Sequence, residues 1–184
     1  MIQDFQTSLA FVLRAEGGAG DDPVDHGGPT NHGITQATYT SWLALHGMHD
    51  APVDGISAEY VEAVYFQCFW TAGGCARLPS PLNLVHFDSC VQHVPGAWRP
   101  MLLSATAFPG ATPEEEAFAL IVLRHNLYNR IAAKDPLQVR FLKGWLNRLT
   151  ALRAAAGLIP PPAIPAPASA SPSPGPAAAP PARP

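Results

Sequence analysis

The stretch of residues 16–35 constrains the fold of this chain more than any other segment. It contains one Glu, three Asp, two His, two Thr and six Gly, so it has little apolar surface to bury in a core. Glycine pairs that bound short β-capable pieces predict a small β-hairpin or a paired extended loop. A segment of this composition between two helices is typical of a functional loop carried by a rigid scaffold.

The segment before this stretch predicts an amphipathic helix over residues 3–16. Phe5, Leu9 and Val12 recur at the spacing of one buried helical face, and Glu16 is the next position on it. Gly17 then offers a residue that ends a helix. Partial burial at the negative end of a helix would raise the pKa of Glu16, as a general acid requires. The alternative, a last-turn Glu turned toward solvent, stays open from periodicity alone.

The predicted loop would bring two further polar side chains beside Glu16. Asp25 supplies a second carboxylate and Thr30 supplies a hydroxyl. Two carboxylates on either side of a sugar linkage, one of them protonated, are the groups that glycoside hydrolysis uses. The residues therefore favour a glycosidase site at the end of the first helix.

These motifs resemble glycoside hydrolase family 108, the bacterial and phage N-acetylmuramidases of lysozyme-like fold. The resemblance begins with Glu16-Gly-Gly and Asp22-Pro-x-Asp25-x-Gly-Gly-x-Thr30-x-x-Gly33-Ile-Thr35. It continues in Phe69-Trp70, Leu78-Pro79, Phe87-Asp88 and Phe141-Leu142-x-Gly144-Trp145-x-x-Arg148, and spans roughly residues 5–150. It implies a mainly α fold, a lysozyme-like helical domain with the small hairpin or extended loop after its first helix.

The resemblance also implies an activity and a set of site residues. The substrate would be the glycan strands of peptidoglycan, cut at the β-1,4 bond between N-acetylmuramic acid and N-acetylglucosamine. Glu16 would be the catalytic acid, and Asp25 with Thr30 would stabilise the sugar cation or position the attacking water. We expect substrate contacts from four more residues: Asn31, Tyr65, Trp70 and Asp88. The alternative for Tyr65 and Trp70 is packing in the core. The alternative for Asp88 is a helix-capping or surface role.

Two departures from the family pattern leave rival functions open. Ala19-Gly20 replaces an aromatic residue, and residues 92–96 replace an Asn-x-Gly motif. Residues 108–157 resemble a reduced form of the family's peptidoglycan-binding half. One rival is therefore a non-catalytic cell-wall-binding or secretion-associated protein of the same fold.

The other rival is a zinc amidase or peptidase acting on peptidoglycan. His26 and His32, with Asp25, could in principle bind zinc, but they lack the helical His spacing or a nearby Cys pair. We predict no metal and no cofactor. Reduced thiols are the simplest account of the three cysteines, Cys68, Cys75 and Cys90, and a Cys68–Cys75 bridge stays open.

Composition limits the partners. A net charge of −3 and a pI near 6.1 argue against nucleic acid. The sequence shows no long apolar run and no signal peptide, so we expect no stable membrane insertion. These features fit an endolysin that is made in the cytoplasm and released through a holin-type pore. We expect it to act on the cell wall as a monomer.

Further helices are expected over residues 36–46, 57–70, 81–94, from about 100 to 108, 113–134 and 136–157. They would form one muramidase domain over residues 1–159. Residues 160–184 contain 11 Pro and 8 Ala among 25 residues and predict a disordered tail.

Overall fold

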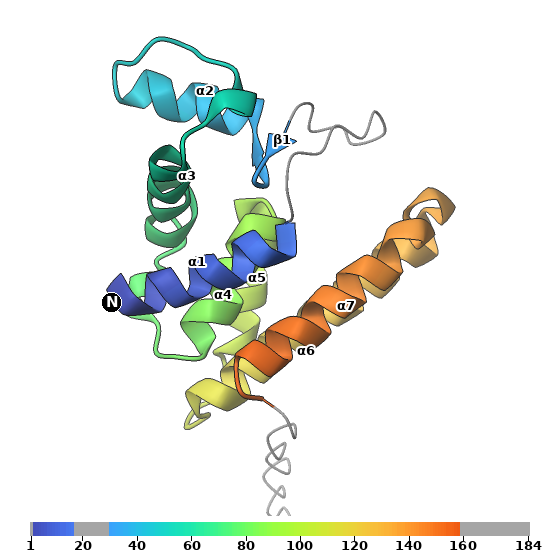
Figure 1. Cartoon of the computed structure of the whole chain (residues 1–184). Helices are drawn as coiled ribbons and strands as arrows, with labels where there is room; N and C mark the ends of the chain where they lie inside the picture. The colour runs from blue at the N-terminus through green and yellow to red at the C-terminus, as the bar shows by residue number, and fades with distance from the viewer. Residues whose placement is uncertain (1, 17–29, 159–184) are drawn as a thin grey trace, which may run out of the picture.

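The computed structural model describes residues 2–16 and 30–158, which form a mainly helical protein (Figure 1). Its N-terminal elements are α1 (Ile2–Glu16), β1 (Thr30–Asn31), β2 (Ile34–Thr35), α2 (Gln36–Leu45), the 3-10 helix η1 (Val53–Gly55), α3 (Ala58–Val64), the π-helix η2 (Tyr65–Thr71) and the 3-10 helix η3 (Cys75–Arg77). The later elements are α4 (Leu82–Gln92), α5 (Pro95–Ala105), α6 (Pro113–Lys134), the 3-10 helix η4 (Pro136–Gln138) and α7 (Val139–Ala155). The predicted Pro/Ala-rich tail and Asp25 lie outside the described residues.

The small hairpin after the first helix is confirmed. Its strands pair antiparallel, with Thr30 opposite Thr35 and Asn31 opposite Ile34. His32 and Gly33 form the two-residue turn with φ angles of 51° and 74°. Positive φ at both central residues is the type I′ geometry that matches the twist of a hairpin, and Gly33 adopts it without steric cost.

Three helix starts, those of α2, α3 and α6, follow capping residues of the sequence. Thr35 and Ser57 accept hydrogen bonds from the backbone N–H groups of Thr38 and Tyr60, and so cap α2 and α3. The sequence Thr112-Pro113-Glu114-Glu115 predicts a capping box, and Thr112 and Glu115 form it at the start of α6.

Two helix starts differ from the prediction. The helix expected from about residue 100 begins instead at Pro95, where the missing N–H costs nothing, and it continues through Pro100. Ser80 followed by Pro81 predicts an N-cap for the helix over residues 81–94, but the helix begins later, with Pro81 in the cap position and no side-chain cap.

Two other helical segments change geometry along their length. The segment expected as one helix from Ser57 toward Trp70 turns from α into π geometry at Tyr65. The last helix is preceded by the separate turn η4. The spacing of Leu137, Phe141, Trp145, Leu149 and Leu152 predicts one buried helical face, but Leu137 is 76% exposed. The buried part of that face is Leu149 and Leu152.

The helix α4 is the centre of the fold. Every residue from Leu82 to Cys90 is buried, and the helix packs against α1, α5, α6, η2 and η3. In Figure 1, α1 crosses α4, while α6 and α7 run side by side and α3 connects the main body to α2 and the hairpin. Four of the buried residues of α4 are polar: Asn83, His86, Asp88 and Ser89. Asn83 and Ser89 form hydrogen bonds within α4, whereas His86 and Asp88 find partners on neighbouring segments.

Within residues 2–16 and 30–158, no helix has both the length and the apolar composition that crossing a bilayer requires.

Candidate functional site

Glu16 is the last residue of α1, and its side chain is 16% exposed. It lies against the turn of the hairpin. A Cβ placed on Gly33 would come within 2.8 Å of Glu16 Cγ, 2.9 Å of Glu16 Oε2 and 2.9 Å of the Tyr65 hydroxyl. The hairpin backbone can therefore approach the carboxyl group this closely only because residue 33 is a glycine.

Two donors from distant helices converge on one oxygen of Glu16. Arg148 of α7 donates from Nη1 to Oε1 at 2.6 Å, and Gln92 of α4 donates from Nε2 to the same oxygen at 2.8 Å. These contacts fix the orientation of the carboxyl group. The other oxygen, Oε2, is the one that lies beside Gly33.

Arg148 joins Glu16 to a second carboxylate inside the protein. Its Nε and Nη2 donate to Asp88 Oδ1 at 3.0 and 2.6 Å, and Arg124 Nη2 lies 2.7 Å from Asp88 Oδ2. The Asp88 and Arg124 side chains are fully buried. Burial alone would raise the pKa of Asp88, but the two guanidinium groups outweigh it and hold this pKa below its ordinary value.

The network continues from Arg124 to two aromatic side chains. Arg124 Nη2 donates to the Tyr128 hydroxyl at 3.2 Å, and this hydroxyl lies 3.2 Å from His93 Nε2. Burial, reinforced by the positive charge of Arg124, lowers the pKa of His93 to about 4. His93 is therefore neutral near pH 7 and adds no charge to the network.

The four charged groups form a neutral chain, Glu16–Arg148–Asp88–Arg124, with two acids and two bases. It connects α1, α4, α6 and α7. Buried charges are tolerated when each has a partner of opposite sign and good geometry. Only Glu16 and Arg148 carry any exposed side-chain surface, 16% and 10%, so the chain of charges reaches solvent at the Glu16 end.

The other polar residues predicted for the site are Thr30, Asn31 and Asp25. Thr30 is partly exposed in β1. Asn31 donates from Nδ2 to the carbonyl oxygens of Val53 and Asp54, so its amide holds the hairpin to η1. Asp25 lies outside the described residues.

The two aromatic candidates are buried. The Tyr65 hydroxyl donates to the carbonyl oxygen of His32 at 2.7 Å. Burial first, and then the charge of Glu16, raise the pKa of Tyr65, so the hydroxyl remains a donor. Trp70 is 2% exposed and packs edge-on against Phe5 and Phe87, so no face of its ring is open for stacking on a sugar.

A cavity of about 300 Å³ lies between α1 and α3, close to this site. Leu9 and Leu13 of α1, His32 of the hairpin turn and Val61 of α3 line it. Leu13 lies one turn before Glu16 on the same side of α1. The apolar hollow and the carboxyl group therefore adjoin along one helix.

Sequence reasoning missed three donors of this site. Arg148 is part of the family motif, but no role was predicted for it. Gln92 was considered only as part of residues 92–96, which depart from the family pattern. Arg124 interrupts an otherwise apolar face that contains Leu120, Ile121 and Tyr128. A basic residue on a buried face is the signal that could have indicated a buried ion pair.

Comparisons with known proteins were made for sequence and structure. A family model described as Glycosyl hydrolase 108 matches residues 9–93, a range that contains Glu16, the hairpin and Gln92. No curated protein sequence matches the chain. A solved structure titled "Structure of Brucella abortus SagA" is similar with a TM-score of 0.71 at 22% identity, over 85% of this chain and 95% of that chain. This likeness is one of fold, and it extends beyond the region that the family model matches.

Proposed function

We propose that the chain is a peptidoglycan hydrolase of lysozyme type, because residues 9–93 match the family model described as Glycosyl hydrolase 108. The bond cut is the β-1,4 linkage between N-acetylmuramic acid and N-acetylglucosamine, and Glu16 is the general acid. The observation that carries this proposal is the placement of Glu16 at the edge of a buried charge network, fixed by two donors and still partly exposed.

The contacts of Glu16 support a division of labour between its two oxygens. Arg148 and Gln92 both donate to Oε1, so Oε2 is the oxygen that would carry the proton. Oε2 gives this proton to the glycosidic oxygen as the bond to the sugar C1 breaks. The carboxylate that remains is stabilised by the guanidinium of Arg148 at 2.6 Å.

The second half of the reaction requires water at the sugar C1. We assign its activation, or the stabilisation of the cationic sugar, to Asp25 and Thr30, on the resemblance of their motif alone. The water adds its hydroxyl to C1 and gives up one proton, to the assisting carboxylate if the reaction inverts or to the Glu16 carboxylate if it retains configuration. The separation of the two carboxyl groups, about 5 Å for retention or 6.5–9.5 Å for inversion, decides the stereochemical outcome.

One observation favours a second candidate function, a wall-binding protein of this fold that does not hydrolyse its ligand. In this structure Arg148 lies directly against Glu16 and Gln92 donates to the same oxygen. These contacts make Glu16 a member of the charge network that holds α1, α4 and α7 together, a structural role that involves no proton transfer.

Purified cell walls and three forms of the full chain separate these functions. The forms are the natural sequence, Glu16→Gln, and the control Glu59→Gln, which changes an exposed acid of α3. We expect the first and third to clear a wall suspension and release reducing ends. Glu16→Gln should be slower by about 10²–10⁴-fold, since a general acid contributes that much.

The products identify the bond that is cut. Muropeptides ending in reducing N-acetylmuramic acid, found by mass analysis, support the muramidase. Release of free amines that a chelator abolishes would indicate the zinc amidase instead. Sedimentation of the natural protein with walls, without any release of products, would indicate the wall-binding protein.

A further inference from the structure

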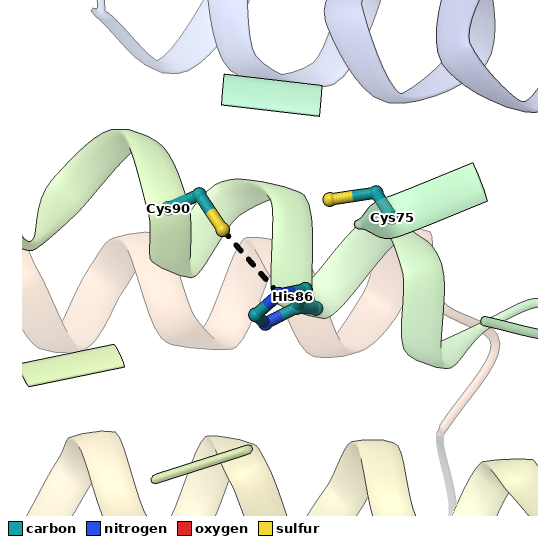
Figure 2. Close-up of side chains that lie close together, drawn as sticks. All are labelled: Cys75, His86 and Cys90. Atoms are coloured by element: carbon teal, nitrogen blue, oxygen red, sulfur yellow. Dashed lines mark hydrogen bonds between the residues drawn. The ribbon is translucent and has the colours of Figure 1, made fainter. Parts of the chain in front are cut away.

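A second polar cluster lies on α4, away from the Glu16 network. Cys75 of η3 meets His86 and Cys90 of α4 (Figure 2). The sulfur and ring-nitrogen atoms of the three side chains all lie within 4.8 Å of one another. All three residues are buried, with exposed fractions of 0% for Cys75 and His86 and 5% for Cys90.

The spacing of these atoms fits a tetrahedral zinc site. Zinc binds Cys sulfur at about 2.3 Å and His nitrogen at about 2.0–2.1 Å, so two such ligands around one ion stand about 3.6 Å apart. Cys90 Sγ lies 3.4 Å from His86 Nε2. These two residues are four positions apart on one helix and project from the same side of it, as paired helical ligands do.

Gly73 brings its backbone against the same atoms. Its carbonyl oxygen lies 2.9 Å from His86 Nε2 and is therefore a candidate fourth ligand. A Cβ on Gly73 would come within 2.6 Å of Cys90 Sγ and 3.1 Å of Cys75 Sγ. A larger residue would therefore fill the space that both sulfur atoms face.

The chemistry of the donor set matches a soft or borderline divalent ion. Two thiolates and one neutral imidazole around Zn²⁺ give a cluster without net charge, which is the form that an apolar interior tolerates best. His86 Nδ1 is buried without a hydrogen-bond partner among the described residues, and the ring packs edge-on against Trp98. The contacts of the ring with the Gly73 carbonyl oxygen and with Cys90 Sγ both lie at Nε2, the nitrogen that would face the metal.

We propose that Cys75, His86 and Cys90 bind one Zn²⁺ ion, with the carbonyl oxygen of Gly73 as the fourth donor. The ion would tie η3 to the central helix. Because its ligands are buried, the ion is structural and does not take part in hydrolysis at Glu16. The sequence prediction of no metal considered only regular motifs, and these ligands come together from two separate elements through the fold.

Metal content of the full-length protein is the first test. The chain is produced with added zinc, freed of loosely bound metal, and analysed by plasma mass spectrometry. We expect one zinc per chain, and a loss of at least about tenfold in Cys75→Ser and Cys90→Ser. The control is Cys68→Ser, which removes the remaining, half-buried cysteine and should keep the metal.

A second measurement needs no variant and so does not depend on the folding of one. The natural chain is stripped with a chelator and loaded with Co²⁺. Intense visible bands with sulfur-to-cobalt charge transfer would support a tetrahedral site with thiolate ligands. A metal-free protein whose three thiols are intact and that takes up neither ion would overturn the proposal. A mass lower by two hydrogens, with a peptide joining Cys75 to Cys90, would replace it with a disulfide.

Discussion

The two polar clusters that share α4 differ in charge and in their access to solvent. On one side Asp88 is paired with two arginines, and the chain of charges runs outward to Glu16, which is 16% exposed. On another side His86 and Cys90 meet Cys75 with almost no exposed surface. A charged cluster that reaches the surface can meet a substrate, whereas a sealed cluster of thiols and imidazole can only stabilise the fold.

Both clusters carry polar atoms into the core, but they are stabilised in different ways. The Glu16 cluster balances two carboxylates with two guanidinium groups, and removing one member leaves the others uncompensated. In the proposed zinc site, the metal ion balances the charge of the two thiolates of the cysteine cluster. This comparison predicts that substitutions in the first cluster affect stability and activity together.

The largest effect is expected from Asp88→Asn. This change keeps the size of the side chain but leaves Arg124 buried without a negative partner and leaves Arg148 with Glu16 alone. Breaking a buried pair in this way costs about 3–5 kcal/mol. Urea unfolding followed by circular dichroism measures this cost, with Asp54→Asn, a change of an exposed acid, as the control. A cost below about 1 kcal/mol would show that the network does not stabilise the fold.

The second prediction concerns the dependence of stability on pH. Folding lowers the pKa of His93 to about 4, against about 6.5 in the unfolded chain. Between these values the unfolded chain binds the additional proton, so stability falls as the pH is lowered from about 6.5 to about 4. The loss is at most about 3 kcal/mol, from about 1.36 kcal/mol for each pH unit.

Thermal unfolding across this pH range tests that expectation. The variant His93→Gln should flatten the curve between pH 6.5 and 4. The control His49→Gln, at an exposed position, should leave the slope unchanged. Equal slopes in all three proteins would mean that His93 titrates normally in the folded state.

The local features of this fold were predictable because they depend on neighbouring residues. The helix caps Thr35, Ser57 and Thr112 and the hairpin after the first helix are each fixed by a few adjacent side chains. The position of Glu16 on the buried face at a helix end followed from helical periodicity in the same way. These elements need no information from distant parts of the chain.

The partners of Glu16 were not predictable by the same reasoning. Arg148 lies 132 residues away and Gln92 lies 76 residues away in the sequence. Only the packing of α1, α4 and α7 brings them together, and no local pattern encodes that packing. The same limit applies to Trp70, because a helical aromatic residue has the same spacing in a core as in a sugar-binding cleft.

The smallest effect on stability, and the most selective effect on function, is expected from Gly33→Ala. The added Cβ would lie 2.8–2.9 Å from Glu16 and from the Tyr65 hydroxyl, and alanine is strained at a φ of 74°. Gly47 offers a matched control, because it has a φ of 66° and no atom within 4 Å of an added Cβ. The strain alone costs about 1–2 kcal/mol in either variant.

Only Gly33→Ala should also displace the Glu16 carboxyl group. We expect wall hydrolysis to fall about 10²-fold in Gly33→Ala and to stay unchanged in Gly47→Ala. The activities are measured well below the unfolding temperatures of both variants. Equal activity would show that the hairpin turn does not position Glu16 for catalysis.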